Sequence, residues 1–308
     1  MFGHCRLGLE IGPQGLTAVA AKRRGRQTVL IDGQVMSLDR DLIRPDFNQP
    51  NVNQPEAFVK ALQQLLRPLY RRDNRIAVSL PDAAGQVFLL TVEAPFKSRS
   101  EGAEIIRWQL QDQLPQTNGK VALDFQILGT TEAGHKKVLV AALQPQVLKQ
   151  YEALIEQAGY AAALIDFHSF SLYNAYQGTL DMGRDFVFVA VAGRQLTLLA
   201  MTNRLPTTYR CRSIAPDPGA LFQELNRSLV KLRQRADFGR LPVHLHADWP
   251  PETVMEAVAG AFEQEVQWLQ TPISYSTNRG KQTLSTADSY LLVAAYGACE
   301  RLLLGGNR

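Results

Sequence analysis

One order of predicted elements occurs twice along the 308 residues, and it constrains the fold more than any other feature. In the first half, short apolar segments separated by turn residues predict a meander of three strands. Each of the two helices that follow opens at a proline (Pro55 and Pro145), carries its leucines on one face, and precedes another strand. These elements lie at residues 5–11, 16–22, 28–31, 55–69, 76–80, 145–158 and 162–165.

The second half repeats the order strand, strand, strand, helix, strand, helix. Its first helix opens at Asp217 and Pro218, a side-chain cap followed by proline, and is expected to end at Gly239. A last helix is predicted over about residues 287–303. Because the two halves share the order of elements without sharing sequence, the repeat is one of topology, about 180 residues apart. The repeated elements lie at residues 186–192, 196–201, 207–214, 217–239, 243–247 and 252–262.

This doubled βββαβα order is similar to the layout of the actin, sugar-kinase and Hsp70 superfamily, in which two RNase H-like lobes face a cleft. We therefore expect an α/β, actin-like fold with a first lobe at residues 1–182 and a second at 183–308. The C-terminal helix is expected to pack back on the first lobe. A block at about residues 83–143, which predicts a strand, a helix (101–114) and two strands, fits a small inserted α+β subdomain.

Composition limits the class of protein. The hydrophobic content of 45% is typical of a globular chain, and a net charge of +4 is too small to favour nucleic acid. The three cysteines lie far apart with no CxxC pair, which indicates a reducing compartment. The first residues contain no signal peptide, and the longest apolar stretches fall short of the ~20 residues that span a bilayer. We expect a cytoplasmic protein that meets a membrane only through a partner.

Six segments spread along the chain resemble the type IV pilus assembly PilM family. They are LGLEIG (7–12), EIIRWQLQDQLP (104–115), LDFQILG (123–129), VLVAALQPQVLKQYEALIEQAGY (138–160), LIDF (164–167) and ADSYLLVAAYGACERLL (287–303). The resemblance implies a cytoplasmic member of the inner-membrane platform of type IV pili, similar also to MshI-like proteins and to the cytoplasmic part of type II secretion GspL proteins. It further implies ATP binding between the lobes, and a groove beside the inserted subdomain for the N-terminal peptide of a bitopic PilN-like protein.

The first phosphate turn of the family is altered in this sequence. Small hydroxyl residues are expected after the glycine, because backbone N–H groups and a hydroxyl hold phosphate oxygens there. Here Gly12 is followed by Pro13, which has no N–H, and by Gln14. Glu10 alone keeps an acid near a metal position, and one carboxylate does not assemble a phosphoryl-transfer site.

The other two nucleotide segments of the family are altered as well. The resemblance implies Asp-x-Gly at the second phosphate turn, but this sequence has Ala190 and Ala192, with Gly193 one position late. The adenosine segment should contain a glycine pair, and residues 244–248 contain none. We therefore predict that the chain is a pseudo-ATPase that binds no nucleotide, has no catalytic residues and needs no cofactor. An ATP-binding or weakly ATP-hydrolysing protein, with Mg-ATP as ligand, is the alternative.

Two other constellations have both a functional and a structural interpretation. His244, His246 and Asp248 alternate on a predicted strand at a spacing that metal ligands use, but no fourth ligand is evident, so a half-exposed strand is favoured and no metal is expected. The basic clusters at residues 22–26, 67–75 and 227–240 are interpreted as solvated faces, with acidic lipid headgroups as the alternative.

Trp108 lies in the predicted helix of the inserted subdomain, where a core position and a groove position are both open interpretations. Tryptophan and arginine are enriched where proteins meet, so Arg107, Trp108 and Gln111 are the candidate partner-binding residues. The predicted function is a scaffold that grips the cytoplasmic segment of a bitopic PilN-like partner and contacts other platform proteins. A metabolite kinase of the same superfold is a further alternative, which the missing Asp-x-Gly turn disfavours.

Overall fold

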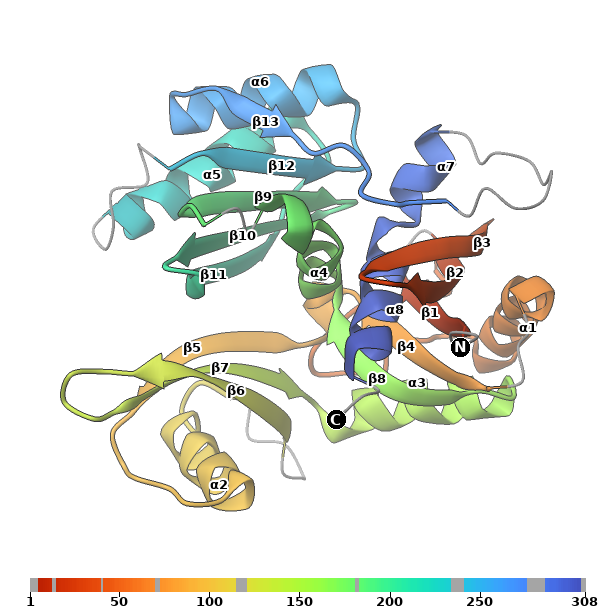
Figure 1. The fold of residues 1–308 in the computed structure, drawn as a ribbon, viewed down its shortest axis with the longest axis horizontal. Coiled ribbons are helices and arrows are strands. Elements are labelled where there is room, and N and C mark those ends of the chain that lie inside the picture. Colours follow the sequence, from red (N-terminus) through yellow and green to blue (C-terminus); the bar gives the residue numbers. More distant parts are fainter. Residues whose placement is uncertain are drawn as a thin grey trace.

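The computed structural model describes residues 5–12, 15–39, 41–69, 73–114, 121–180, 183–233, 241–275 and 286–305. The strands in these segments form two five-stranded sheets and one three-stranded sheet (Figure 1). In both large sheets an antiparallel meander of three strands is extended by two parallel strands, and the strand order is the same. The doubled topology predicted from the sequence is confirmed.

The first lobe is built on the sheet β3-β2-β1-β4-β8. Leu7, Leu9 and Ile11 of β1 point to one face of this sheet, where they pack against Phe58 of α1 and Tyr151 of α3. The elements of this lobe are β1 (Cys5–Ile11), β2 (Gly15–Arg24), β3 (Gln27–Ser37), α1 (Pro55–Leu66), η1 (Arg67–Leu69), β4 (Arg75–Leu80), η2 (Asp82–Ala84), α3 (Pro145–Gln157), β8 (Ala161–Phe167) and α4 (His168–Leu180).

The second lobe is built on the sheet β11-β10-β9-β12-β13, whose outer face α5 and α6 cover. β9 is buried along almost its whole length, as expected for a central strand with helices on both sides. The elements are β9 (Phe186–Ala192), β10 (Gln195–Thr202), β11 (Leu205–Ser213), α5 (Pro218–Arg233), β12 (Val243–Ala247), α6 (Pro251–Phe262) and β13 (Val266–Trp268). The predicted end of the first helix at Gly239 lies outside the described residues.

A separate small sheet, β5-β7-β6, follows η2 and carries one helix on one face. Its own core includes Ile106 of the helix and Phe125 of β6, so it is a separate small unit attached to the first lobe (Figure 1). Gly85 directly precedes β5, and the backbone there passes close to β8. A Cβ at this position would lie 2.0 Å from the ring of Phe167, so a glycine is needed where the chain enters the subdomain. The elements are β5 (Gln86–Val92), α2 (Arg99–Gln109), β6 (Ala122–Thr130) and β7 (Lys136–Leu143).

Two helices, α4 and α8 (Val293–Gly305), lie between the two large sheets (Figure 1). They approach each other closely at Gly297, where a Cβ would lie 1.8 Å from the carbonyl oxygen of Ser171. α8 also packs on β1, since a Cβ at Gly8 would lie 2.0 Å from the carbonyl oxygen of Ala295. The C-terminal helix thus lies against the first lobe and helps to join the lobes.

The structure corrects two sequence-based boundaries and adds one helix. The predicted helix 101–114 ends at Gln109, because the backbone at Leu110 leaves the helical region (φ −94°, ψ 1°) and continues in turns. The predicted C-terminal helix is divided at Leu292 into α7 (Thr286–Leu291) and α8. The added helix is α4, which the sequence does not predict because it begins directly after β8 without a turn and is apolar on more than one side.

Candidate functional site

The predicted nucleotide positions lie at the carboxyl ends of the parallel strands of both lobes, where ligands bind in open α/β sheets. Glu10 is near the end of β1 and Gly12 follows that strand; Ala190 is buried in β9, beside His246 of β12. Ala192 ends β9, and Gly193 forms the turn to β10. Gln14 lies outside the described residues. Two of these positions, Glu10 and Gly193, contact charged side chains of the chain itself.

Glu10 is paired with a histidine that the sequence did not reveal as its partner. His168 begins α4, and its Nδ1 lies 2.8 Å from Glu10 Oε1, with both side chains about 15% exposed. Thr17 donates its hydroxyl to the other carboxylate oxygen at 3.0 Å. Burial alone would lower the pKa of His168, but Glu10, with Asp82 and Asp248 further away, raises the pKa to about 9. The imidazole is therefore a cation at neutral pH.

Asp248, directly after β12, binds the turn between β9 and β10. Both its carboxylate oxygens accept the backbone N–H of Gly193, at 3.0 and 2.8 Å. Trp249 Nε1 donates to the carbonyl oxygen of the same glycine at 2.8 Å, and Gly193 has a positive φ of 55°. Asp248 is an exposed residue, and partial burial of its carboxylate raises its pKa. The turn is thus held from both its N–H and its carbonyl side.

An aromatic stack fills the space next to this turn. The rings of His246 and Tyr290 stack at 4.4 Å with an angle of 11°, and Trp268 stacks on Tyr290 at 5.9 Å. Tyr176 of α4 hydrogen-bonds His246 Nδ1 at 3.0 Å, and burial lowers the pKa of His246 far below its ordinary value. His244 instead packs its ring against Phe186. The described residues include no group of three side chains placed to hold a metal ion.

A buried hydrogen-bond network joins the lobes beside this cluster. Asp82 of η2, in the first lobe, accepts the hydroxyls of Tyr209, in β11 of the second lobe (2.9 Å), and of Ser169, in α4 (2.5 Å). The Tyr209 ring stacks on Phe170 at 5.2 Å, and burial raises the pKa of its hydroxyl. Asp82 also lies just before Gly85 and β5. One carboxylate therefore contacts both lobes where the inserted subdomain begins.

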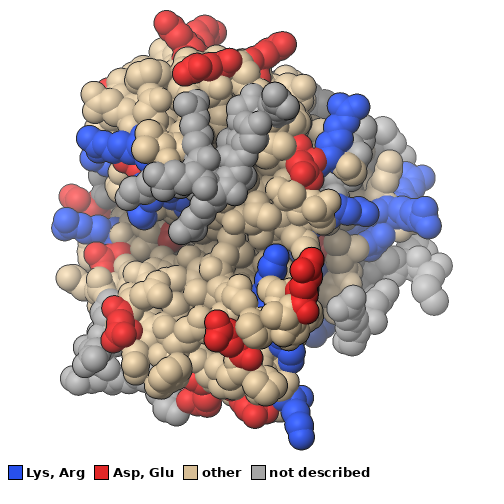
Figure 2. All heavy atoms as spheres, turned by 90° about the vertical axis from the view of Figure 1, so that its left-hand side faces the viewer, with Lys and Arg blue, Asp and Glu red and all other residues tan. Residues whose placement is uncertain are grey.

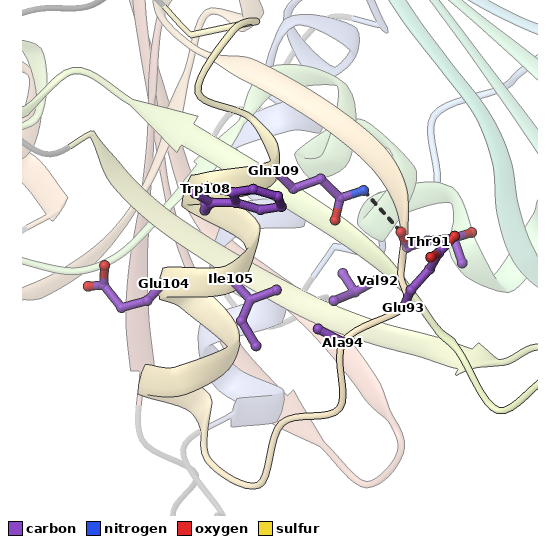
Figure 3. A pocket seen from close by; sticks show the side chains of 8 residues that line it. All are labelled: Thr91, Val92, Glu93, Ala94, Glu104, Ile105, Trp108 and Gln109. Atoms are coloured by element: carbon purple, nitrogen blue, oxygen red, sulfur yellow. Dashed lines mark hydrogen bonds between the residues drawn. The ribbon is translucent and has the colours of Figure 1, made fainter.

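An open pocket of about 670 Å³ lies between β5 and α2 in the inserted subdomain (Figure 3). Trp108 and Ile105 extend from the helix, facing Val92 and Ala94 on the strand side. Trp108 is 71% exposed, which excludes the core interpretation. The other lining residues are Thr91, Glu93, Glu104 and Gln109, of which Gln109 Nε2 donates to the carbonyl oxygen of Thr91 at 3.0 Å.

The other candidate partner residues do not line this pocket. Arg107 pairs with Glu104 at 2.8 Å and donates to the carbonyl oxygen of Val121 at 3.4 Å, and Gln111 is exposed beyond the end of the helix. The pocket lies within the inserted subdomain, whereas the resemblance implied a partner groove beside the subdomain. Figure 2 shows acidic and basic side chains interspersed over one face of the molecule.

Known proteins share both the sequence pattern and the architecture of this chain. The sequence matches the family model described as type IV pilus assembly protein PilM over residues 8–215. The structure is similar to that of a PilM-PilN type IV pilus biogenesis complex, with a TM-score of 0.80 and 18% identity, over 97% of this chain and 98% of that one. No curated protein sequence matches.

Two further solved structures share the fold. Ethanolamine utilization protein EutJ from Carboxydothermus hydrogenoformans aligns with a TM-score of 0.54 and 10% identity, over 99% of this chain and 91% of that one. A Bacteroides thetaiotaomicron protein with an actin-like ATPase fold aligns with a TM-score of 0.51 and 11% identity, over 86% and 90%. The fold is therefore the actin-like, two-lobed α/β fold expected from the sequence. No helix in the described part of the chain is long and apolar enough to cross a membrane.

Proposed function

Because the chain belongs to the type IV pilus assembly PilM family, we propose that it is a non-catalytic scaffold of an inner-membrane pilus or secretion platform. In this proposal it binds the N-terminal cytoplasmic segment of a bitopic PilN-like protein, which attaches it to the cytoplasmic face of the membrane. The observation that carries the proposal is the pocket at Trp108. The similarity to a protein that forms a PilM-PilN complex supports the kind of partner.

The pocket has the chemistry of a peptide site. Its centre is apolar, formed by Val92, Ala94, Ile105 and Trp108, and Glu93 and Glu104 add carboxylates to its lining. A large aromatic side chain that is mostly exposed on a helix, beside an apolar hollow, is typical of a binding hot spot. Helix α2 is anchored below the pocket by Ile106, which is fully buried, so Trp108 is presented on a fixed support. A short segment with apolar side chains fits such a surface.

The scaffold role without nucleotide is supported by the side chains at the predicted nucleotide positions. The second phosphate turn of the family carries an acid where this chain has the buried methyl of Ala190, so β9 supplies no carboxylate for a metal. His246 and Tyr290 are in ring contact, which leaves no slot between them for a base. Glu10, the acid that the family would use, is already paired with His168. A weakly ATP-binding protein is the alternative that a nucleotide titration tests.

The experiment is a titration of the nucleotide-free protein with a labelled peptide that copies the N-terminal cytoplasmic segment of the PilN-like partner. Trp108→Ala is expected to weaken binding by about thirtyfold, since hot-spot truncation costs about 2 kcal/mol or more. Phe222→Ala is the matched control, because Phe222 is also a large exposed apolar side chain (42%) but lies on α5 of the second lobe. Arg107→Glu is expected to have a smaller effect than Trp108→Ala.

Two outcomes would contradict the proposal. If Trp108→Ala and Phe222→Ala both bind the peptide as the unaltered protein does, the pocket is not the peptide site. If Arg107→Glu abolishes binding while Trp108→Ala leaves it unchanged, the peptide lies on the side of α2 that faces Val121 and not in the pocket.

A further inference from the structure

The turn between β9 and β10 presents a donor that is chemically suited to a phosphate oxygen. Gly193 stands at the carboxyl end of a central strand, with its backbone in the left-handed region (φ 55°). A backbone N–H at such a position is a group that holds anions in many α/β proteins. In this chain the N–H is not free, because the two oxygens of Asp248 accept it at 3.0 and 2.8 Å.

Asp248 is held in this position by its own neighbours. Its backbone N–H donates to the carbonyl oxygen of Val191 at 3.1 Å, which fixes the end of β12 against the end of β9. The next residue, Trp249, donates its indole N–H to the carbonyl oxygen of Gly193 at 2.8 Å. Asp248 and Trp249 therefore make three sets of hydrogen bonds to β9 and the turn that follows it. The bond from the Asp248 backbone to Val191 fixes the position of the Asp248 carboxylate.

The second charged group of the inference is the imidazolium of His168, which is paired with Glu10 of β1. His168, at the start of α4, contacts Glu10 at 2.8 Å, and its Nε2 is buried without a hydrogen-bond partner among the described residues. Asp82 and Asp248 act on it electrostatically from η2 and from the end of β12, and His246 is a neighbour that burial keeps neutral. A bound nucleotide would bring a phosphate and a divalent cation to acidic residues. Here the imidazolium of His168 is paired with Glu10, and the carboxylate of Asp248 lies on the N–H of Gly193.

We infer that Asp248 and His168 are built-in substitutes for a phosphate group and its counter-cation, so that the chain occupies its own interlobe site. This inference rests on the proposed nucleotide-independent function and adds a physical cause to it. Asp248 masks the turn by accepting the N–H of Gly193. When the carboxylate is removed, this N–H becomes free to bind a phosphate oxygen. A carboxylate at position 248 and a phosphate on Gly193 exclude each other.

The test uses inorganic pyrophosphate as the probe, titrated calorimetrically into the full chain and three variants. Asp248→Ala is expected to bind pyrophosphate about tenfold or more tightly than the unaltered protein, which should show no binding up to about 10 mM. Asp248→Asn keeps an acceptor oxygen of the same shape on Gly193, so it should stay masked. Asp185→Ala is the matched control, because Asp185 also accepts a backbone N–H (Asn203, 2.7 Å) in the second lobe and its removal changes the net charge equally.

The outcomes separate this inference from the proposed function. A gain in Asp248→Ala alone supports it. An equal gain in Asp185→Ala shows a general effect of charge, and no gain in a folded Asp248→Ala shows that nothing was masked; either result overturns it. Tight Mg-ATP binding by the unaltered protein would instead refute the nucleotide-independent function. If Asp248→Ala does not fold, the amide NMR signal of Gly193 decides: it must shift with the titration of Asp248, and a constant signal overturns the inference.

Discussion

Tyr209→Phe removes one hydroxyl from the network that joins the lobes, and its effect can be worked out from the contacts. The hydroxyl donates to Asp82 at 2.9 Å, while the ring stacks on Phe170 at 5.2 Å and 13°. Phenylalanine keeps the stack and the packing, and Ser169 still donates to Asp82. The loss is therefore one hydrogen bond to a buried carboxylate, which contributes about 1.5–3 kcal/mol to the free energy of unfolding.

The comparison variant is Tyr296→Phe. Its hydroxyl is also buried, but it donates to a neutral acceptor, the carbonyl oxygen of Thr28, at 2.7 Å. Hydrogen bonds between neutral groups contribute about 1 kcal/mol, so Tyr209→Phe should cost more than the same substitution at Tyr296. Urea unfolding measures both, as a shift of the midpoint at unchanged slope. A Tyr209→Phe protein as stable as the unaltered one, or one less affected than Tyr296→Phe, would refute the idea that Asp82 ties the lobes together.

Two further predictions concern the elements between the sheets. The pKa of His168 is raised from 6.5 to about 9 in the folded protein, so the stability from its protonation is complete below pH 6.5 and is lost as the pH rises to about 9. At 1.36 kcal/mol per pKa unit this amounts to about 3 kcal/mol, and the difference in unfolding free energy between the unaltered protein and His168→Gln should shrink over that pH range; a constant difference would contradict it. Gly297→Ala should destabilise the protein by at least about 3 kcal/mol, because its Cβ would meet the backbone of α4 at 1.8 Å, whereas Gly178→Ala, with open space around it, should stabilise α4 by up to about 1 kcal/mol. Thermal unfolding decides, and similar melting temperatures for the two alanine variants would show that α4 and α8 are not packed as described.

The doubled topology was predictable because each element carries a local signal. Turn residues separate the apolar segments of each meander. The prolines at positions 55 and 145 predict helix starts, and the structure confirms both starts. Helix α4 carries no comparable signal. It is buried between two lobes, so Leu172 and Tyr176 are accompanied by apolar residues on its other sides and the helical period is weak.

The candidate sites depended on contacts that are distant in the sequence. The loss of the Asp-x-Gly turn at residues 190–192 was visible in the sequence alone. That His168 pairs with Glu10, that Tyr209 meets Asp82, and that Asp248 binds Gly193 depends on how the lobes meet, and no periodicity or spacing encodes it. The sequence alone likewise does not decide the exposure of Trp108, because Ile105 and Ile106 precede it in the same helix and the side that faces the core is not marked. The structure buries Ile106 fully, which turns Trp108 to the opposite side of the helix.

In the proposed function, partner binding needs no nucleotide. This is tested most directly by calorimetric titration of the N-terminal cytoplasmic peptide of the PilN-like partner into the nucleotide-free protein, and again with Mg-ATP at about 2 mM. We expect the same dissociation constant in both titrations, because in the proposed arrangement Asp248, His168 and the stack of His246 on Tyr290 stand where a nucleotide would bind. Peptide affinity that changes by about tenfold or more with Mg-ATP, equal to about 1.4 kcal/mol of coupling, would contradict it.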